Sequence, residues 1–355
     1  MVKNVVMLID PMLNIFGSVR PAILISRFLV ERGFKVCLVS QIVSPKIRIP
    51  HVNVISLGRE NILPKTLAIV EAWVRRVKNK TTPCNNCVLI NLSQGFEVQT
   101  HIYYGQGPLY EAMEDIVSKY PVSNPYKLLY LISKKVVAML DKNFNKSLRE
   151  KVEVFIANSY YTKKLYEKIG IEVDKVIYPP IDANVFKPST KTPLENYVLT
   201  YFGKETWFKP ILKLLDLGVK IVAFGSKPLS IPRKVLRHRN LVFLGYVPTL
   251  KLVKLYSNAL YTLFTFTHEP FGYIPVESMA CGTPVLTYDR QGPRETVIPE
   301  ETGWLVRDDN ELVKCAIRIW REKYNYSIRR KCKLRSLKFH YENVGNEWLK
   351  IIMSI

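Results

Sequence analysis

Long apolar runs are missing from this chain of 355 residues. A membrane-spanning helix needs about 20 consecutive apolar residues, and the richest stretch, residues 128–140, is interrupted by Lys134 and Lys135. The apolar segment at residues 1–10 is too short for a signal peptide and ends in Asp-Pro instead of a small-residue cleavage site. We therefore expect no membrane span and no signal peptide. We interpret residues 3–10 as a buried strand.

Cysteine is also scarce, because six cysteines in a chain of this length do not make a disulfide scaffold. Cys84 and Cys87 have the spacing of half a zinc site, but a structural zinc needs four ligands and no second pair is present. We interpret the pair as two thiols or a local disulfide in a turn before a strand. Cys37 and Cys281 lie in apolar surroundings and are expected to be small core residues.

Acidic residues are few compared with basic ones. The chain has 52 Lys and Arg against 30 Asp and Glu, a formal net charge of +22. Such a field favours phosphates, nucleic acid or an acidic membrane surface. No RNA-recognition motif, zinc finger or aromatic-rich basic strand set is present. Nucleic acid is therefore not an expected partner, and a basic nucleic-acid-binding protein is the less favoured alternative.

Apolar residues make up 48% of the chain, enough to bury a full core, and they alternate between strand and helix patterns. Strands are expected at residues 3–10, 35–41, 87–93, 98–104, 154–159, 175–178, 197–203, 220–225, 241–247, 260–267 and 284–288. Helices are expected at 18–32, 64–77, 108–118, 127–151, 160–170, 249–258 and 272–280, and the last 45 residues or so look helical. This alternation predicts an α/β fold with parallel sheets covered by helices on both faces.

The length suits two domains better than one. We expect a first Rossmann-like domain at residues 1–186, a proline-containing linker at 187–196, a second Rossmann-like domain at 197–340 and a C-terminal helix at 341–355. Ligands of doubly wound sheets bind beyond the carboxyl ends of the strands, so functional residues are expected directly after strands.

The clearest chemical signal is the segment 268–285, which follows a predicted strand and opens a helix. Gly272 allows the backbone to approach a ligand closely, and Pro275 fits the first helical turn because its missing N–H costs nothing there. Free N–H groups and the helix dipole form an anion site suited to a diphosphate. Glu269 and Glu277 flank this turn, so one carboxylate can address a sugar and the other a ribose. From spacing alone, two surface glutamates beside a buried helix remain an alternative.

This segment resembles the signature of glycosyltransferase family 4, which has two glutamates separated by seven residues with Phe-Gly after the first. The continuation at residues 279–285 is equally typical, as are residues 292–297 and 302–306, and residues 241–247 resemble the family's strand near the nucleotide base. The resemblance implies a GT-B fold: two Rossmann-like domains facing across a cleft, with the acceptor on the first domain, the nucleotide-sugar on the second, and C-terminal helices packing back toward the first domain.

The resemblance also implies roles for individual residues. Glu269 would stabilise positive charge at the anomeric carbon of the transferred sugar, and Glu277 would hold the ribose. The other donor-binding positions implied are Gly17, Gly203, Tyr246, Val247, Phe271, Gly272, Tyr273 and Ile274. The family's Arg and Lys, which grip the diphosphate, correspond to Lys204 and Lys209. Lysine binds as a point charge without the bidentate fork of arginine.

The first domain departs more from the family pattern. The usual Gly-Gly loop becomes Gly17-Ser18, where Gly17 allows close donor approach or forms a plain turn, and the Ser18 hydroxyl is a candidate helix cap. The alignment puts Gln106 in place of the family's sugar-facing His, so we assign it a catalytic-site role through a sugar hydroxyl. His101 lies five residues upstream inside a predicted strand and is a possible acceptor-side or sugar-side residue. A strand histidine of the core is the alternative.

The resemblance therefore implies a retaining glycosyltransferase that transfers a hexose from a UDP- or GDP-sugar to a glycan or lipid-linked acceptor. The sequence contains no Asp-x-Asp pair, so we expect no metal cofactor, with charge neutralisation by Lys204 and Lys209. Another GT-B enzyme, an epimerase or phosphorylase, is the alternative.

A basic amphipathic pattern at residues 127–151 suits a membrane surface. A helix with its apolar side in the core is the alternative there. We expect a cytoplasmic protein with peripheral attachment to the inner face of the membrane.

Overall fold

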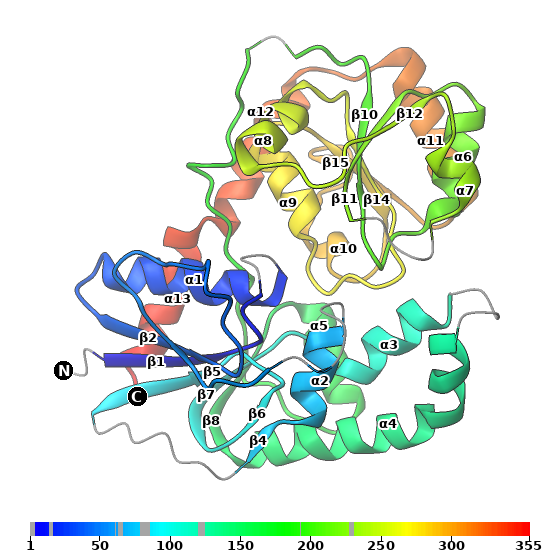
Figure 1. Ribbon diagram of the computed structural model, residues 1–355. Helices are drawn as coiled ribbons and strands as arrows, with labels where there is room; N and C mark the ends of the chain where they lie inside the picture. The colour runs from blue at the N-terminus through cyan, green and yellow to red at the C-terminus, as the bar shows by residue number, and fades with distance from the viewer. Residues whose placement is uncertain are drawn as a thin grey trace. The chain divides into compact units, whose positions relative to one another are not determined.

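A computed structural model describes residues 4–13, 17–60, 62, 67–78, 86–119, 125–191, 193–226 and 231–355 (Figure 1). Contacts between backbone segments divide the chain into two compact units. Unit 1 contains Met1–Ala112, Ser133–Pro180 and Tyr341–Ile355, and unit 2 contains Met113–Ile132 and Ile181–His340. Helices α3 (Leu109–Val117) and α4 (Pro125–Glu150) contribute residues to both units. Each unit is described by itself.

The sheet of unit 1 is parallel and runs in the order β3-β2-β1-β5-β7-β8-β9. Its strands are β1 (Asn4–Ile9), β2 (Lys35–Ser40), β3 (Asn53–Ser56), β5 (Cys87–Asn91), β7 (Thr100–Gly105), β8 (Val152–Ala157) and β9 (Lys175–Val176). Strand order reverses between β1 and β5, the position where doubly wound sheets open a crevice. Helices α1 (Arg20–Val30), α2 (Ala68–Val74) and α5 (Tyr160–Lys168) connect these strands.

Three local predictions in unit 1 need correction. The helix expected at 64–77 ends at Val74, and Val77 instead pairs in β4 (Val77–Lys78) with β6 (Phe96–Glu97). Residues 63–66 lie outside the described residues. Strand β3 escaped prediction because it is a mostly exposed strand with few apolar residues. Ser18 does not cap α1, since Val19 is the N-cap residue and its side chain makes no cap hydrogen bond.

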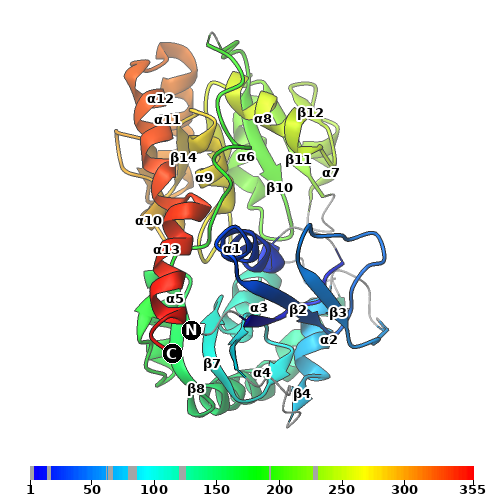
Figure 2. The ribbon, with the colours of Figure 1, turned by 90° about the vertical axis from the view of Figure 1, so that its left-hand side faces the viewer.

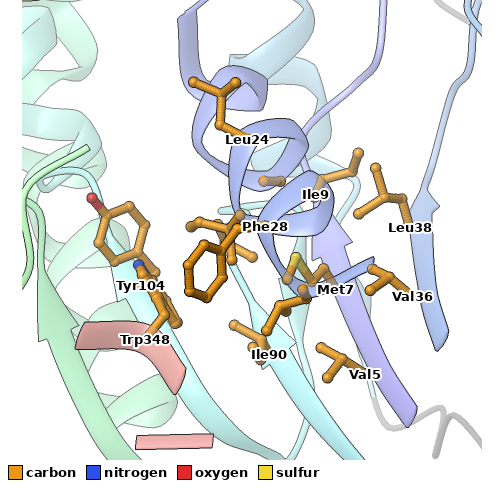
Figure 3. Packing of buried hydrophobic residues seen from close by; sticks show 14 of the residues in the cluster. Val5, Met7, Ile9, Leu24, Phe28, Val36, Leu38, Ile90, Tyr104 and Trp348 are labelled. Atoms are coloured by element: carbon orange, nitrogen blue, oxygen red, sulfur yellow. The ribbon is translucent and has the colours of Figure 1, made fainter. Parts of the chain in front are cut away.

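The core of unit 1 is closed by the last helix of the chain, α13 (Tyr341–Ile352), which packs against α1 (Figures 1 and 2). Trp348 is fully buried, and its ring packs edge-to-face against that of Tyr104, with 5.2 Å between the ring centroids (Figure 3). A Cβ at Gly345 would lie 2.3 Å from Cγ of Phe28, so only glycine allows this approach of the two helices. The predicted return of the C-terminus to the first domain is confirmed for α13.

The sheet of unit 2 is also parallel, in the order β12-β11-β10-β13-β14-β15. Its strands are β10 (Val198–Phe202), β11 (Ile221–Gly225), β12 (Leu241–Phe243), β13 (Thr262–Phe264), β14 (Val285–Tyr288) and β15 (Gly303–Val306). Its helices are α6 (Phe208–Asp216), α7 (Arg233–Leu236), α8 (Thr249–Asn258), α9 (Tyr273–Ala280), α10 (Pro293–Thr296), α11 (Asp309–Glu322) and α12 (Ser327–Ser336). Strand β15 was not predicted, and β12 and β13 are shorter than expected. The strand order reverses between β10 and β13.

Both units are therefore Rossmann-like, and the predicted α/β fold is confirmed. Within the described residues, no helix has the length and apolar character needed to cross a membrane. Cys87 is disulfide-bonded, which favours the local disulfide of the two interpretations above, while Cys84 lies outside the described residues.

A buried arginine fixes α12 to the rest of unit 2. Arg329 is 8% exposed, and its guanidinium donates to the carbonyls of Ser257, Ala259 and Gly282 at 3.3, 2.6 and 3.1 Å. These carbonyls belong to the C-terminal ends of α8 and α9, where helices leave backbone acceptors unsatisfied and the helix dipole is negative. The Nε atom also donates to Glu195 at 3.2 Å.

We expect Arg329→Met to destabilise unit 2 by about 3 kcal/mol, because it leaves several buried carbonyls without donors. Denaturant unfolding followed by tryptophan fluorescence measures this. Arg330→Met is the matched control, because Arg330 is the exposed neighbour on the same helix and its loss should change stability by no more than about 0.5 kcal/mol. Equal unfolding midpoints for the two variants would contradict the assignment.

Candidate active site

The predicted site residues of unit 2 gather at the carboxyl ends of β10 and β13, beside the reversal of strand order. The segment 203–209 follows β10, and the segment 265–272 follows β13. An antiparallel bridge between Thr206 and Phe266 joins the two segments, and the Thr267 N–H donates to the Glu205 carbonyl at 2.7 Å. This is the edge of a doubly wound sheet at which ligands bind.

The Glu269 carboxylate is held by the backbone at the start of α9. Its Oε1 accepts hydrogen bonds from the N–H groups of Phe271 at 3.3 Å and Gly272 at 2.9 Å. Gly272 has φ of +102°, a left-handed conformation that residues with a Cβ rarely adopt. The N–H groups of Phe271 and Gly272 were expected to hold the sugar and phosphate of the donor. In the structure they donate to the Glu269 carboxylate instead. The carboxylate itself is fixed at the mouth of the predicted anion site.

Burial and a second carboxylate raise the pKa of Glu269. Burial raises the pKa of Glu269 to about 7, and the nearby Glu205 carboxylate adds to that rise, while the two backbone N–H groups oppose it. Near pH 7 the side chain therefore exchanges between its neutral and ionised forms. Only the ionised form can stabilise positive charge that develops on a ligand.

Residues 291–293 hold the Glu269 loop in place through hydrogen bonds and close packing. Gln291 accepts a hydrogen bond from the Glu269 N–H at 2.6 Å, and the Gly292 N–H donates to the Glu269 carbonyl at 3.0 Å. A Cβ at Gly292 would lie 2.4 Å from the Phe271 backbone, so glycine is required for this packing. The side chain of Phe271 is buried in the core and contacts the rings of Tyr273 and Phe339.

Glu277 lies on α9 and is 5% exposed. Its Oε2 accepts a hydrogen bond from the Tyr256 hydroxyl of α8 at 3.1 Å. Tyr256 was not singled out in the sequence, because its position in the middle of an amphipathic helix is also typical of a core residue. It orients the carboxylate that is predicted to bind the ribose.

Lys204 and Lys209 line one cavity of about 320 Å³, together with Thr206, Trp207 and Thr267. Both lysine side chains are exposed, and Lys209 is the second residue of α6, where the helix dipole also favours an anion. Thr206 shapes the turn: its Oγ1 accepts from the Gly203 N–H at 2.8 Å and donates to the Tyr201 carbonyl at 3.2 Å. The predicted cations are thus brought together beside one pocket.

The predicted base-side residues follow β12. Gly245 adopts φ of +65°, and its carbonyl accepts from the Gly225 N–H at 2.8 Å. Tyr246 is 70% exposed, whereas Val247 is 7% exposed and belongs to the core. An exposed aromatic ring at the end of a strand is suited to contact a planar base, so Tyr246 remains the better candidate of the two.

In unit 1, Gly17 and Gln106 belong to one hydrogen-bonded cluster at the carboxyl ends of β1, β5 and β7. Gly17 has φ of +67°. The Gln106 amide donates to the carbonyls of Ser18 at 3.0 Å and Leu92 at 3.4 Å. Its NH₂ group therefore fixes the Gly17-Ser18 turn, which leaves only its oxygen for the predicted contact with a sugar hydroxyl. Residues 14–16 of the predicted loop lie outside the described residues.

A buried aspartate that the sequence did not single out completes this cluster. Asp10 is 4% exposed, and its Oδ1 accepts from the Ser93 hydroxyl at 2.7 Å and the Gln94 N–H at 3.3 Å. It also hydrogen-bonds Ser18, which explains what the Ser18 hydroxyl does instead of capping α1. Burial raises the pKa of Asp10.

His101 lies at the amino end of β7, away from the edge that carries Gln106. Its Nδ1 accepts a hydrogen bond from the Leu89 N–H at 2.9 Å. This position favours the structural interpretation of His101 over a contact with acceptor or sugar.

The comparisons with known proteins identify the second unit. Residues 213–333 match the family profile described as "Glycosyl transferases group 1". The match covers about a third of the chain and lies within unit 2, and it indicates a GT-B fold. The fold also follows from a solved sucrose-phosphate synthase of Thermosynechococcus elongatus, which is 17% identical with a TM-score of 0.72 over 99% of this chain and 98% of that one. A protein of Anabaena solved with UDP-glucose is 15% identical, with a TM-score of 0.71 over 99% and 100% of the two chains.

Sequence relatives match shorter stretches of this chain. The alpha-1,3/1,6-mannosyltransferase of Neurospora crassa is 47% identical over 72 residues, 20% of this chain and 15% of the relative. A probable sucrose-phosphate synthase of Thermosipho melanesiensis is 26% identical over 253 residues, 64% of this chain and 58% of the relative. The alignments with these relatives therefore span less than two thirds of the relatives' own length.

Proposed function

We propose that this glycosyltransferase transfers a hexose from a UDP- or GDP-sugar to a glycan or lipid-linked acceptor, with retention of the anomeric configuration. The observation that carries the proposal is the Glu269 carboxylate, held by backbone N–H groups at the sheet edge that also carries Lys204, Lys209 and Glu277. The names of the relatives, a mannosyltransferase and a sucrose-phosphate synthase, are consistent with hexosyl transfer. The complex of the Anabaena protein with UDP-glucose supports a nucleotide-sugar donor.

In the proposed mechanism the residues of unit 2 divide the donor between them. Lys204 and Lys209 bind the diphosphate and offset the charge that builds on it as the bond to the anomeric carbon breaks. Glu277 accepts hydrogen bonds from the ribose hydroxyls. The ionised Glu269 stabilises the positive charge at the anomeric carbon. The acceptor oxygen attacks from the face of the leaving phosphate, and that phosphate takes the acceptor proton, so the configuration is retained.

The donor is best identified by a thermal-shift panel of sugar nucleotides. A ligand that binds the folded state alone raises the melting temperature in proportion to its affinity. A shift with one sugar nucleotide that exceeds the shift with the bare nucleotide would name both base and sugar. A panel without any shift would contradict the proposed activity.

We further propose that α4 attaches the enzyme reversibly to an anionic membrane. Seven apolar side chains of α4 are exposed by 40–76%: Leu128, Leu129, Leu131, Ile132, Val136, Met139 and Leu140. Leu128, Ile132 and Val136 recur every four residues and so share one face of the helix. The opposite face is buried through Tyr130, Phe144 and Leu148. The apolar residues of the predicted stripe are therefore exposed, and a different set of apolar residues packs in the core.

Exposed lysines accompany the apolar stripe of α4, namely Lys135, Lys142 and Lys146, whereas Lys134 is half-buried. Each cation near an anionic surface contributes about 1 kcal/mol and is screened beyond about one Debye length. Apolar side chains that enter the interface add to this attraction. The combination suits an attachment that salt can release, on the inner face of the membrane in the cytoplasm.

Replacing Lys135, Lys142 and Lys146 with glutamine should weaken binding to phosphatidylglycerol vesicles by up to about 100-fold in co-sedimentation, because three such contacts together contribute about 3 kcal/mol at most. Ile132→Ser with Val136→Ser should reduce it further. The control replaces the exposed Lys251, Lys254 and Lys314 with glutamine, which changes the net charge equally but leaves α4 intact. If both triple variants bind vesicles equally well, net charge and not α4 is responsible.

A further inference from the structure

Two polar groups at the end of β10 lack partners among the described residues, although both are half-buried. They are the Tyr201 hydroxyl and the Glu205 carboxylate, which receives a hydrogen bond only from its own N–H. Both border the same point, because a Cβ at Gly203 would lie 2.7 Å from the Tyr201 hydroxyl oxygen and 2.7 Å from Glu205 Oε1. Half-buried polar groups without partners are costly unless a ligand or water satisfies them.

The surroundings of Tyr201 are acidic, in contrast to the net charge of +22 of the whole chain. Burial raises the pKa of Tyr201, and the carboxylates of Glu205, Glu269 and Glu277 add to that rise. The hydroxyl therefore stays protonated and can donate. Burial raises the pKa of Glu205, while Lys204 and His268 oppose that rise electrostatically. Lys209 lies on the cavity side with Lys204.

We propose that this site admits a neutral or amino sugar and excludes a sugar that carries a carboxylate, and that Glu205 is the residue that sets this selectivity. The inference rests on the proposed function, since it assumes that a nucleotide-sugar occupies the site. A carboxylate accepts hydrogen bonds from sugar hydroxyls, whereas it repels the carboxylate of a uronic acid.

Local geometry assigns this role to Glu205 and not to its neighbours. Lys204 precedes it and lines the cavity with Lys209, so the cations suit the diphosphate. Glu205 is fixed by the hydrogen bond from the Thr267 N–H to its carbonyl, two residues before Glu269. The two carboxylates therefore approach the space for the sugar from adjacent segments. Glu277 accepts a hydrogen bond from Tyr256, and the proposed function assigns it to the ribose.

The test compares UDP-glucose with UDP-glucuronic acid by isothermal titration calorimetry at pH 8. Two unit charges about 5 Å apart at an effective dielectric constant of about 20 correspond to a ratio on the order of 100-fold in affinity. We expect the wild type to bind UDP-glucose roughly 100-fold more tightly than UDP-glucuronic acid. In Glu205→Gln the ratio should fall to about tenfold, while the affinity for UDP alone should not change. The exposed Glu301→Gln is the control and should keep the wild-type ratio.

A second measurement keeps the inference testable if Glu205→Gln does not fold. Burial raises the pKa of Glu205 and raises that of Glu269 to about 7, so both carboxylates lose charge as the pH falls. The wild-type ratio should therefore be larger at pH 8 than at pH 6, where the uronic acid is still ionised. Glu205→Asp keeps the charge and should retain discrimination. Equal affinities for the two sugar nucleotides, or an unchanged ratio in Glu205→Gln, would overturn the inference while the proposed activity stands. If UDP does not bind, GDP-mannose and GDP-mannuronic acid replace the pair. Failure of both nucleotides to bind would overturn the activity and the inference together.

Discussion

Glu269→Gln is expected to lower kcat on the true donor by about 10²–10³-fold, the range for losing one preorganised electrostatic contact. Glutamine keeps the size of the side chain and an oxygen for the N–H groups of Phe271 and Gly272, so the loop should keep its shape. What it loses is the negative charge that opposes positive charge at the anomeric carbon. Affinity for the bare nucleotide should stay within about threefold, because the nucleotide is assigned to Glu277 and the lysines.

Glu277→Ala should show the reverse pattern, with weaker nucleotide binding and a smaller loss of kcat. Steady-state kinetics and calorimetry with the bare nucleotide separate the two effects. If both variants retain wild-type kinetics on a donor that the wild type turns over, neither carboxylate has the assigned role.

The pH dependence gives a further check on Glu269. Its pKa is raised to about 7, and the ionised form is the active one, so kcat/KM should fall as the pH is lowered through about 7. Removing the Glu205 charge with Glu205→Gln should move this fall to lower pH, since Glu205 contributes to the rise. A profile that is flat from pH 5.5 to 8 would show that Glu269 does not act through its charge.

Lys209→Ala is expected to lower kcat/KM by about 2–4 kcal/mol in transition-state energy, roughly 30- to 1000-fold. In the proposed mechanism the loss reflects the charge that builds on the leaving diphosphate, and Lys209 lies at the start of α6 beside the cavity assigned to it. Lys213→Ala is the control, because Lys213 is exposed one turn further along the same helix. A loss below about threefold for Lys209→Ala would make this lysine a bystander.

The same reasoning predicts that activity survives EDTA. The sequence lacks an Asp-x-Asp pair, and Lys204 and Lys209 are brought together at one cavity. We expect activity within about twofold of the untreated enzyme, whereas complete loss that Mg²⁺ or Mn²⁺ restores would assign charge neutralisation to a metal. Lys209→Ala measured with and without Mg²⁺ distinguishes the two sources of positive charge.

Local patterns in the sequence were enough to predict most of the elements and the candidate residues of unit 2. Strand and helix periodicity repeats over a few residues, and the order of Glu269, Gly272, Pro275 and Glu277 fixes a strand end, a turn and a helix start in one continuous segment. Where a pattern was weak, prediction failed. Strand β3 carries few apolar residues, and Val77 leaves the helical pattern of α2 to pair with Phe96.

Contacts between distant segments were decided only by the tertiary structure, because no periodicity encodes them. The sequence places Glu205 and Glu269 more than 60 residues apart, yet the bridge between Thr206 and Phe266 brings their segments together. Burial raises the pKa of Glu269, and the Glu205 carboxylate adds to that rise. The partner of Glu277, Tyr256, comes from another helix.

The exposed side of α4 was likewise undetermined by the sequence. Its apolar residues satisfy the pattern of a core helix as well as that of a surface helix, and only the tertiary structure shows which side of the helix is buried.

The sequence by itself thus determined the repeating α/β pattern and the motif of the site, since both depend on neighbours along the chain. The tertiary structure decided which carboxylates share an environment and which apolar face meets solvent, since burial and charge depend on neighbours in space.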